Sequence, residues 1–89
     1  MSSSVSVIIP VFNEQDSIRQ VLSDIPDGLH ADIIVVDNGS TDKTAETAEA
    51  SGARIVREAR KGYGSACLAG IAALESPEIV VFLDGDYSD

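Results

Sequence analysis

The chain has 89 residues, of which 44% are hydrophobic and 24% are charged, and its formal net charge is −9 at pH 7. This length allows one domain with a modest core, and the composition excludes disordered, collagen-like and coiled-coil proteins. The negative charge argues against nonspecific binding to nucleic acid or to anionic membrane surfaces. The apolar runs are far shorter than the ~20 residues that cross a bilayer. With the single Cys67, which cannot form an internal disulfide, a reducing cytoplasm fits the composition.

Apolar segments rich in β-branched residues predict four short strands. The gaps between them, about 15 to 20 residues each, are too long for hairpins and fit the crossover helices that parallel pairing requires. The order is therefore βαβαβαβ, and right-handed crossovers give a doubly wound half-sheet. The last segment is so apolar that we expect its strand to be covered on both faces. The predicted strands are Val5 to Val11, Ile33 to Val36, Ala53 to Val56 and Ile79 to Leu83.

Helical spacing of apolar residues fills the gaps between the strands. We expect the first helix after Asn13, as its N-cap, and the second to begin at Ser40 or Thr41, with Asp42 in its first turn, and to end at Gly52. The third helix lies before the last strand. The apolar residues that mark the first and third helices are Ile18, Val21, Leu22, Ile25, Cys67, Ile71 and Leu74.

Aspartates follow two of the predicted strands. Asp84 and Asp86 come directly after the last strand, and Asp37 ends the second. Because ligands in parallel sheets bind beyond the carboxyl ends of the strands, these side chains are expected at one edge. Three carboxylates there would repel one another unless a cation joined them, and Mg²⁺ prefers carboxylate and phosphate oxygens. We interpret the pattern as a metal-assisted phosphate site, although Asp-Gly-Asp is also common in simple turns.

The segment after the second strand contains an Asn-Gly pair, which in another context signals a hairpin. Helix-forming residues follow it from Lys43 to Ala50, so we interpret it as a strand-to-helix loop with Gly39 at the bend. Asp37 accepts hydrogen bonds but donates none at pH 7, and it can accept one from a base or a ribose. Its alternative role is that of an ordinary turn residue.

A Gly-Tyr-Gly sequence from Gly62 to Gly64 opens the third helix, next to Arg60 and Lys61. The glycines allow a close approach of the backbone and the helix N-terminus to an anion. The segment is a poor dinucleotide fingerprint, because Cys67 replaces the third glycine and no strand directly precedes it. A flexible loop with solvated cations is the alternative.

Four blocks of the sequence, residues 7–14, 35–42, 61–66 and 82–88, together resemble the amino-terminal half of a family-two glycosyltransferase. They stand in the order and spacing of that family, and the branch they most resemble is that of the polyprenyl-phosphate sugar synthases, such as dolichyl-phosphate mannosyltransferase. The resemblance implies a Rossmann-like, three-layer α/β sheet, the nucleotide-binding half of a GT-A fold.

The resemblance also implies residue roles. Asp84 and Asp86 match the DXD motif, which would bind Mg²⁺ or Mn²⁺, with Asp86 as the direct metal ligand. Asp37 would contact the base. Asn38 departs from the family, which often has a second Asp there. The residues that would bind the nucleotide sugar are Pro10, Phe12, Glu14, Asp37, Lys61, Gly62, Gly64 and Asp84.

The implied reaction is transfer of a sugar from a UDP- or GDP-linked donor to an acceptor such as polyprenyl phosphate, in which the metal stabilises the departing diphosphate. No general base can be assigned in the chain. Because family members continue well past the DXD motif, we expect residues 1–89 to be one domain, the donor-binding part of a longer enzyme, without transferase activity alone. The full-length enzyme would work in the cytoplasm or at the cytoplasmic face of a membrane.

A non-catalytic module that binds a nucleotide or nucleotide sugar remains the alternative. A partner, or self-association across an exposed edge strand, would then complete the sheet. A signalling receiver domain fits poorly, because such domains need an acidic pair after the first strand and a late lysine. Here that position carries Asn13 and Glu14, and no lysine follows Lys61.

Overall fold

The computed structural model describes residues 5–25, 32–74 and 79–83. The elements in these residues alternate between strand and helix, so the predicted βαβαβαβ order is confirmed. The strands are β1 (Val5–Val11), β2 (Asp32–Asp37), β3 (Arg54–Arg57) and β4 (Ile79–Phe82). The helices are α1 (Ile18–Ser23), α2 (Thr44–Ala50) and α3 (Tyr63–Ala72).

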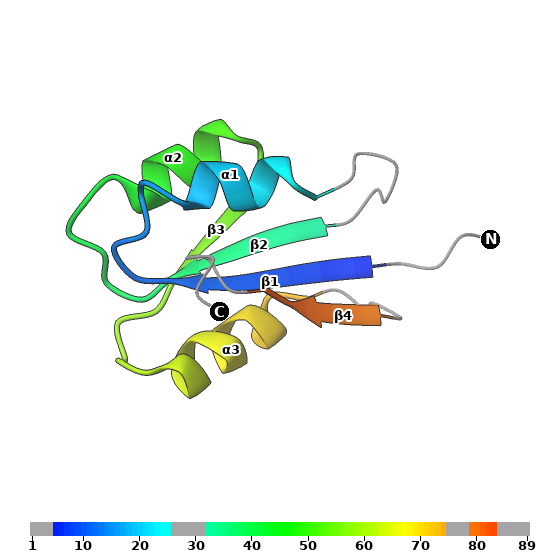
Figure 1. Cartoon of the computed structure of the whole chain (residues 1–89). Coiled ribbons are helices and arrows are strands. Elements are labelled where there is room, and N and C mark those ends of the chain that lie inside the picture. The colour runs from blue at the N-terminus through cyan, green and yellow to red at the C-terminus, as the bar shows by residue number, and fades with distance from the viewer. Residues whose placement is uncertain (1–4, 26–31, 75–78, 84–89) are drawn as a thin grey trace.

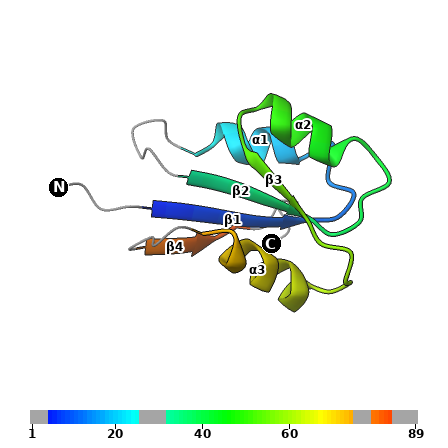
Figure 2. The ribbon, with the colours of Figure 1, turned by 180° about the vertical axis from the view of Figure 1, so that it is seen from behind.

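The strands form one sheet in the order β3-β2-β1-β4, and every neighbouring pair is parallel. Helices α1 and α2 lie on one face of the sheet and α3 lies on the other, which makes three layers (Figures 1 and 2). The ends of β1 and β2 are aligned, because Val11 pairs with Asp37. The loops that follow these two central strands therefore leave the sheet side by side, as the sequence predicts.

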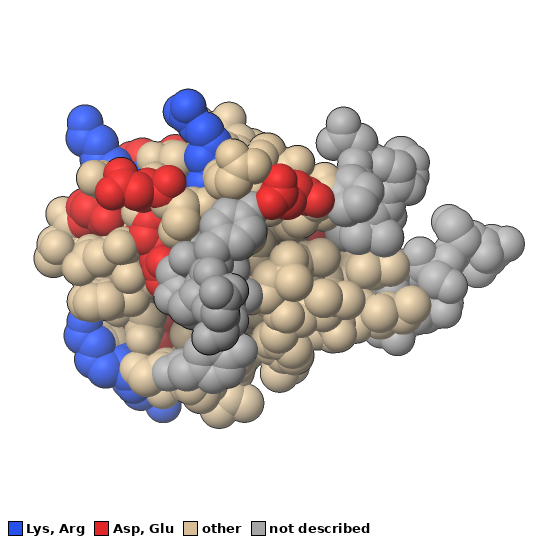
Figure 3. Space-filling view, in the orientation of Figure 1, with Lys and Arg blue, Asp and Glu red and all other residues tan. Residues whose placement is uncertain are grey.

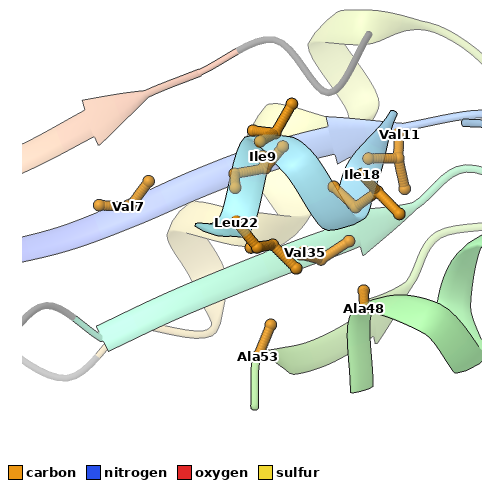
Figure 4. Close-up of a cluster of buried hydrophobic side chains, with 9 residues drawn as sticks. Val7, Ile9, Val11, Ile18, Leu22, Val35, Ala48 and Ala53 are labelled. Carbon is orange, nitrogen blue, oxygen red and sulfur yellow. The ribbon is translucent and has the colours of Figure 1, made fainter. Parts of the chain in front are cut away.

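The two central strands are mostly apolar in their interiors, with Ser6 as a buried exception, because both of their faces are buried. The odd-numbered residues of β1 pack with Val35 under α1 and α2 (Figure 4), whereas Ile8 on β1 packs with Ile34, Val36 and Ala66 under α3. Helix α3 approaches closely, since a Cβ atom on Gly70 would lie 2.6 Å from Cγ2 of Ile8. Successive residues of one strand thus supply two different cores.

The predicted helix starts require correction. Helix α1 begins at Ile18 with Ser17 at the N-cap position, not after Asn13. Asn13 instead has a φ of 52°, a left-handed conformation that asparagine tolerates better than most residues. Helix α2 begins at Thr44, with Lys43 as N-cap, so the predicted start at residue 40 or 41 is too early. The expected capping residues Asn13 and Ser40 bind across the two loops: the Asn13 side chain accepts from the Thr41 N–H, and the Ser40 hydroxyl accepts from the Asn13 N–H.

The expected C-terminal end of the second helix is confirmed. The last residue of α2 is Ala50, Ser51 is its C-cap, and Gly52 follows with a φ of +96°. This is the left-handed residue that commonly ends a helix, and glycine adopts it without a steric penalty.

The prediction that both faces of the last strand are covered is wrong for β4. Its residues are 37–48% exposed, because β4 is at the edge of the described sheet and pairs with β1 alone. Self-association across this edge stays a prediction. Among the described residues, no helix combines the length and the apolar character needed to span a membrane.

Candidate functional site

The loops after β1 and β2 are joined by hydrogen bonds at the carboxyl edge of the sheet. The Asn13 amide oxygen accepts a bond from the backbone N–H of Thr41 at 2.9 Å, and the Asn13 N–H donates to the Ser40 hydroxyl at 2.8 Å. The N–H of Glu14 donates to the Thr44 hydroxyl at 2.8 Å. These bonds fix Glu14 and its neighbours relative to the second loop, although nearly 30 residues of sequence separate the two.

Asp42 organises the start of α2. Its Oδ1 accepts from the Thr44 N–H at 2.9 Å and from the Thr44 hydroxyl, and its Oδ2 accepts from the Gln15 N–H at 3.3 Å. Desolvation by burial alone would raise the pKa of Asp42, but the hydrogen bonds from Thr44 and Gln15 outweigh it and hold the pKa below its usual value. A lowered carboxyl pKa stabilises the fold above the unfolded-state pKa, and this contribution is lost as the pH falls through the folded-state pKa.

Thr44 is fully buried and links both loops through its hydroxyl. Replacing Thr44 by valine keeps the volume but leaves the Glu14 N–H without that acceptor, so we expect the free energy of unfolding to fall by about 1–3 kcal/mol. Thr44→Ser keeps the hydroxyl and serves as the control, with a smaller loss from the missing methyl group. Urea unfolding followed by circular dichroism measures both variants. An equal loss in Thr44→Ser and Thr44→Val would contradict a role for the hydroxyl.

Asp37 lies at the end of β2 and is 3% exposed. Its Oδ1 accepts from the Ser40 N–H at 2.9 Å, and its Oδ2 is 3.3 Å from Nη1 of Arg57, a side chain that is itself 70% exposed. The sequence suggests that a bridging cation compensates this carboxylate. In the described residues, Arg57 and the backbone of Ser40 supply that compensation.

A pocket of about 190 Å³ opens where β1 ends. Phe12 contributes a half-exposed ring, 49% accessible, and the Lys61 ammonium lies over that ring, 4.5 Å from its centroid. This distance is that of a cation–π interaction. The structure therefore brings together Phe12 and Lys61, which the sequence had placed near one nucleotide. The residues that line the pocket are Pro10, Val11, Phe12, Glu14, Asn38 and Ala66.

A second pocket of about 190 Å³ is lined by Asp37, by the start of the loop that follows β2, and by residues at the end of β3 and just after it. Asp37 thus lines a different pocket from Phe12 and Glu14. The predicted nucleoside residues do not all face one cavity. The residues that line the second pocket are Asp37, Gly39, Ser40, Arg57, Glu58 and Ala59.

The segment between β3 and α3 contacts two residues that line the first pocket, because Lys61 lies over Phe12 and Gly62 binds Asn38. The Gly62 N–H donates to the Asn38 amide oxygen at 3.0 Å, and Gly62 has a φ of +117°. Gly64 lies one residue inside α3. A side chain on Gly39 would lie 2.9 Å from the Lys61 ammonium nitrogen, so this glycine leaves the space that the lysine occupies.

Asp84 and Asp86, the predicted metal ligands, lie outside the described residues. The residue before them is described: the Leu83 N–H donates to the Ile8 carbonyl at 3.0 Å, so the chain leaves β4 beside β1. Within residues 5–25, 32–74 and 79–83, no group of three His, Cys, Asp or Glu side chains is arranged to hold a metal. Figure 3 shows charged side chains of both signs at the end of the molecule where the strands end.

The sequence profile of glycosyl transferase family 2 matches residues 6–89 of the chain. The chain belongs to glycosyltransferase family 2. An uncharacterised glycosyltransferase of Mycobacterium tuberculosis is 48% identical over 85 residues, which are 96% of this chain and 38% of that protein. Glucosyl-3-phosphoglycerate synthase of the same organism is 44% identical over 94 residues, covering 93% of this chain and 29% of the synthase. This family-2 chain therefore spans between a quarter and two fifths of the length of such relatives.

Solved structures give the same result for the fold. The crystal structure of the M. tuberculosis glucosyl-3-phosphoglycerate synthase with Mn²⁺, UDP and glucosyl-3-phosphoglycerate has a TM-score of 0.82 and 41% identity. A complex of that synthase with Mg²⁺ and UDP has a TM-score of 0.80 and 40% identity. Each comparison covers 96% of this chain and 34% of the solved chain. The three-layer sheet of this family-2 chain is thus the GT-A fold that the sequence predicts.

Sequence reasoning missed two parts of this family-2 site. Asn38 was interpreted as a lost negative charge, whereas its side chain binds the segment after β3. The sequence motifs give Arg57 no role, whereas the structure pairs it with Asp37. Their position gives a partial signal, because Arg57 ends β3 and pairs in register with Asp37. Side chains at the ends of neighbouring parallel strands are expected to meet.

Proposed function

We propose that this chain binds the donor of a sugar transfer, a UDP-linked sugar, together with Mn²⁺ or Mg²⁺. The observation that carries the proposal is the first pocket at the carboxyl edge of the sheet, which the half-exposed Phe12 ring and Glu14 line, with the Lys61 ammonium lying over the Phe12 ring. An aromatic face can stack on a base, and an ammonium attracts phosphate. Related synthases at 40–41% identity were crystallised with UDP and either metal, which favours UDP over GDP.

The two aspartates that are predicted to bind the metal suit Mg²⁺ or Mn²⁺. Asp84 and Asp86 carry carboxylate oxygens, the ligands that Mg²⁺ and Mn²⁺ prefer, and they follow Leu83, which is bonded to β1. When bound, the metal would offset the negative charge of the departing diphosphate. Lys61 adds a positive charge from the protein, and Phe12 orients the donor by contact with the base.

The proposed acceptor carries a phosphate group. Related synthase structures are complexes with phosphoglyceric acid and with glycerol 3-phosphate, which favours a small phosphorylated acceptor over the polyprenyl phosphate suggested by the sequence resemblance. The matched segment is about a third of those synthases. We therefore propose that these 89 residues supply donor binding and that transfer needs further residues, among them a general base.

Calorimetry tests donor binding. We expect UDP-glucose to bind the chain in the presence of Mn²⁺, more tightly than GDP-glucose, and to lose at least about tenfold in affinity when Mn²⁺ is replaced by EDTA. Asp86→Asn should reproduce that loss in Mn²⁺. Asp16→Asn removes the same charge at an exposed site and is the control, with unchanged affinity.

Two results would contradict the proposal. If UDP-glucose, UDP and GDP-glucose all fail to bind a folded chain, donor binding is wrong. If incubation with UDP-glucose, Mn²⁺ and phosphoglyceric acid yields a glucosylated product, the division between donor binding and transfer is wrong. Binding without any effect of Mn²⁺ or of Asp86→Asn would instead support a metal-independent nucleotide-binding module.

A further inference from the structure

Asn38 connects three strands at the edge of the first pocket. Its backbone N–H donates to the Val11 carbonyl at 2.9 Å, which ties the end of β2 to the end of β1. Its side-chain nitrogen donates to the carbonyl oxygens of Glu58 at 2.9 Å and Arg60 at 2.6 Å, both after β3. Its side-chain oxygen accepts from the Gly62 N–H at 3.0 Å. With 9% of its surface exposed, Asn38 is almost enclosed by these partners.

The chemistry of these contacts requires an amide. Two carbonyl oxygens need two donors and the Gly62 N–H needs an acceptor, and a side-chain amide supplies both from one planar group. A carboxylate of the same shape has no proton to donate at pH 7 and would face the Glu58 and Arg60 carbonyls with its own negative charge. The neutral Asn38 is therefore matched to the segment from Glu58 to Gly62 in a way that Asp is not.

The same segment carries the lysine of the proposed donor site. Lys61 lies between Arg60 and Gly62, two of the three residues that bind the Asn38 side chain. Its ammonium is 3.5 Å from the Asn38 backbone carbonyl and 4.5 Å from the centroid of the Phe12 ring. A lysine side chain has many rotamers, so fixing its backbone on both sides restricts where its charge can lie.

We propose that Asn38 is a positioning residue: it fixes the segment from Glu58 to Gly62 so that the Lys61 ammonium lies over Phe12, which lines the first pocket. This inference rests on the proposed donor binding for its functional consequence. Its structural content is that the Asn38 side chain fixes the backbone on both sides of Lys61. This placement can be measured without any ligand.

Proton NMR of the free chain tests the placement. The ring current of Phe12 should shift the ε-methylene protons of Lys61 upfield, and Lys43, the other lysine of the sequence, is an internal reference. Asn38→Asp and Asn38→Ala should both remove this upfield shift, and Asn38→Ala, which also lacks the acceptor for the Gly62 N–H, should speed hydrogen exchange of the Gly62 amide by at least tenfold, while far-UV circular dichroism stays unchanged. Gln20→Glu makes the same amide-to-carboxylate change at an exposed site on α1 and should leave both signals as in the wild type.

Calorimetry with UDP in the presence of Mn²⁺ then links placement to binding. We expect Asn38→Asp to bind UDP at least tenfold more weakly, Asn38→Ala to be affected in the same direction, and Gln20→Glu to bind like the wild type. If the Lys61 shift persists in both Asn38 variants, or if it disappears without weakening UDP binding, the inference is overturned. If the wild type binds no UDP, the proposed function fails, whereas the NMR result still decides whether Asn38 places Lys61.

Discussion

Replacing Ile8 by alanine is expected to lower the free energy of unfolding by about 2–5 kcal/mol. Ile8 is completely buried in β1 and packs with Ile34, Val36 and Ala66 under α3. The site cannot close easily after truncation, because Ile8 lies in the central part of the sheet, with β2 on one side and β4 on the other. Since small domains have a total stability of about 5–15 kcal/mol, this loss is a large fraction of the total.

Urea unfolding followed by circular dichroism measures the effect of Ile8→Ala as a shift of the transition midpoint. The matched control is Ile71→Ala, the same truncation on α3 at a side chain that is 47% exposed, for which we expect a loss below about 1 kcal/mol. Equal midpoint shifts for the two truncations would contradict the conclusion that Ile8 contributes more to the core than Ile71.

Replacing Phe12 by alanine is expected to weaken UDP binding by about tenfold to a hundredfold, because stacking of a base on an aromatic ring contributes about 1–3 kcal/mol. Phe12 is half exposed, lines the first pocket and lies under the Lys61 ammonium. The substitution thus removes both the proposed stacking surface and the cation–π partner of Lys61. Because half of the ring is already accessible to solvent, the effect on folding should be much smaller than that of Ile8→Ala.

Calorimetry of Phe12→Ala with UDP and Mn²⁺ is read against two controls. Phe12→Tyr keeps an aromatic face and should bind within a few fold of the wild type, whereas Leu68→Ala removes an exposed apolar side chain from α3, outside the pocket, and should have no effect. Wild-type affinity in Phe12→Ala would exclude base stacking on this ring. A loss in Leu68→Ala as large as in Phe12→Ala would point to a general effect on the fold.

Several features of the fold could be predicted from local sequence signals. The bounds of β1 match the prediction residue for residue, since Val5 to Val11 is an apolar segment with no competing signal. Gly52 marks the end of α2 because a left-handed residue favours glycine. The helix starts were not predictable in the same way. Asn13 and Ser40 are both good capping residues, but the Asn13 side chain accepts from the Thr41 N–H and the Ser40 hydroxyl accepts from the Asn13 N–H, so both bind across the loops.

The sequence by itself determined the strand–helix order, the family and the set of polar residues at one edge of the sheet, because periodicity and motif spacing are local properties of the chain. Only the tertiary structure decided which of those residues contact one another. It paired Asp37 with Arg57, turned the Asn38 amide toward the segment after β3, and placed Lys61 over Phe12. Each of these contacts joins residues on different strands or loops, and the choice among possible partners depends on distances that exist once the sheet has formed.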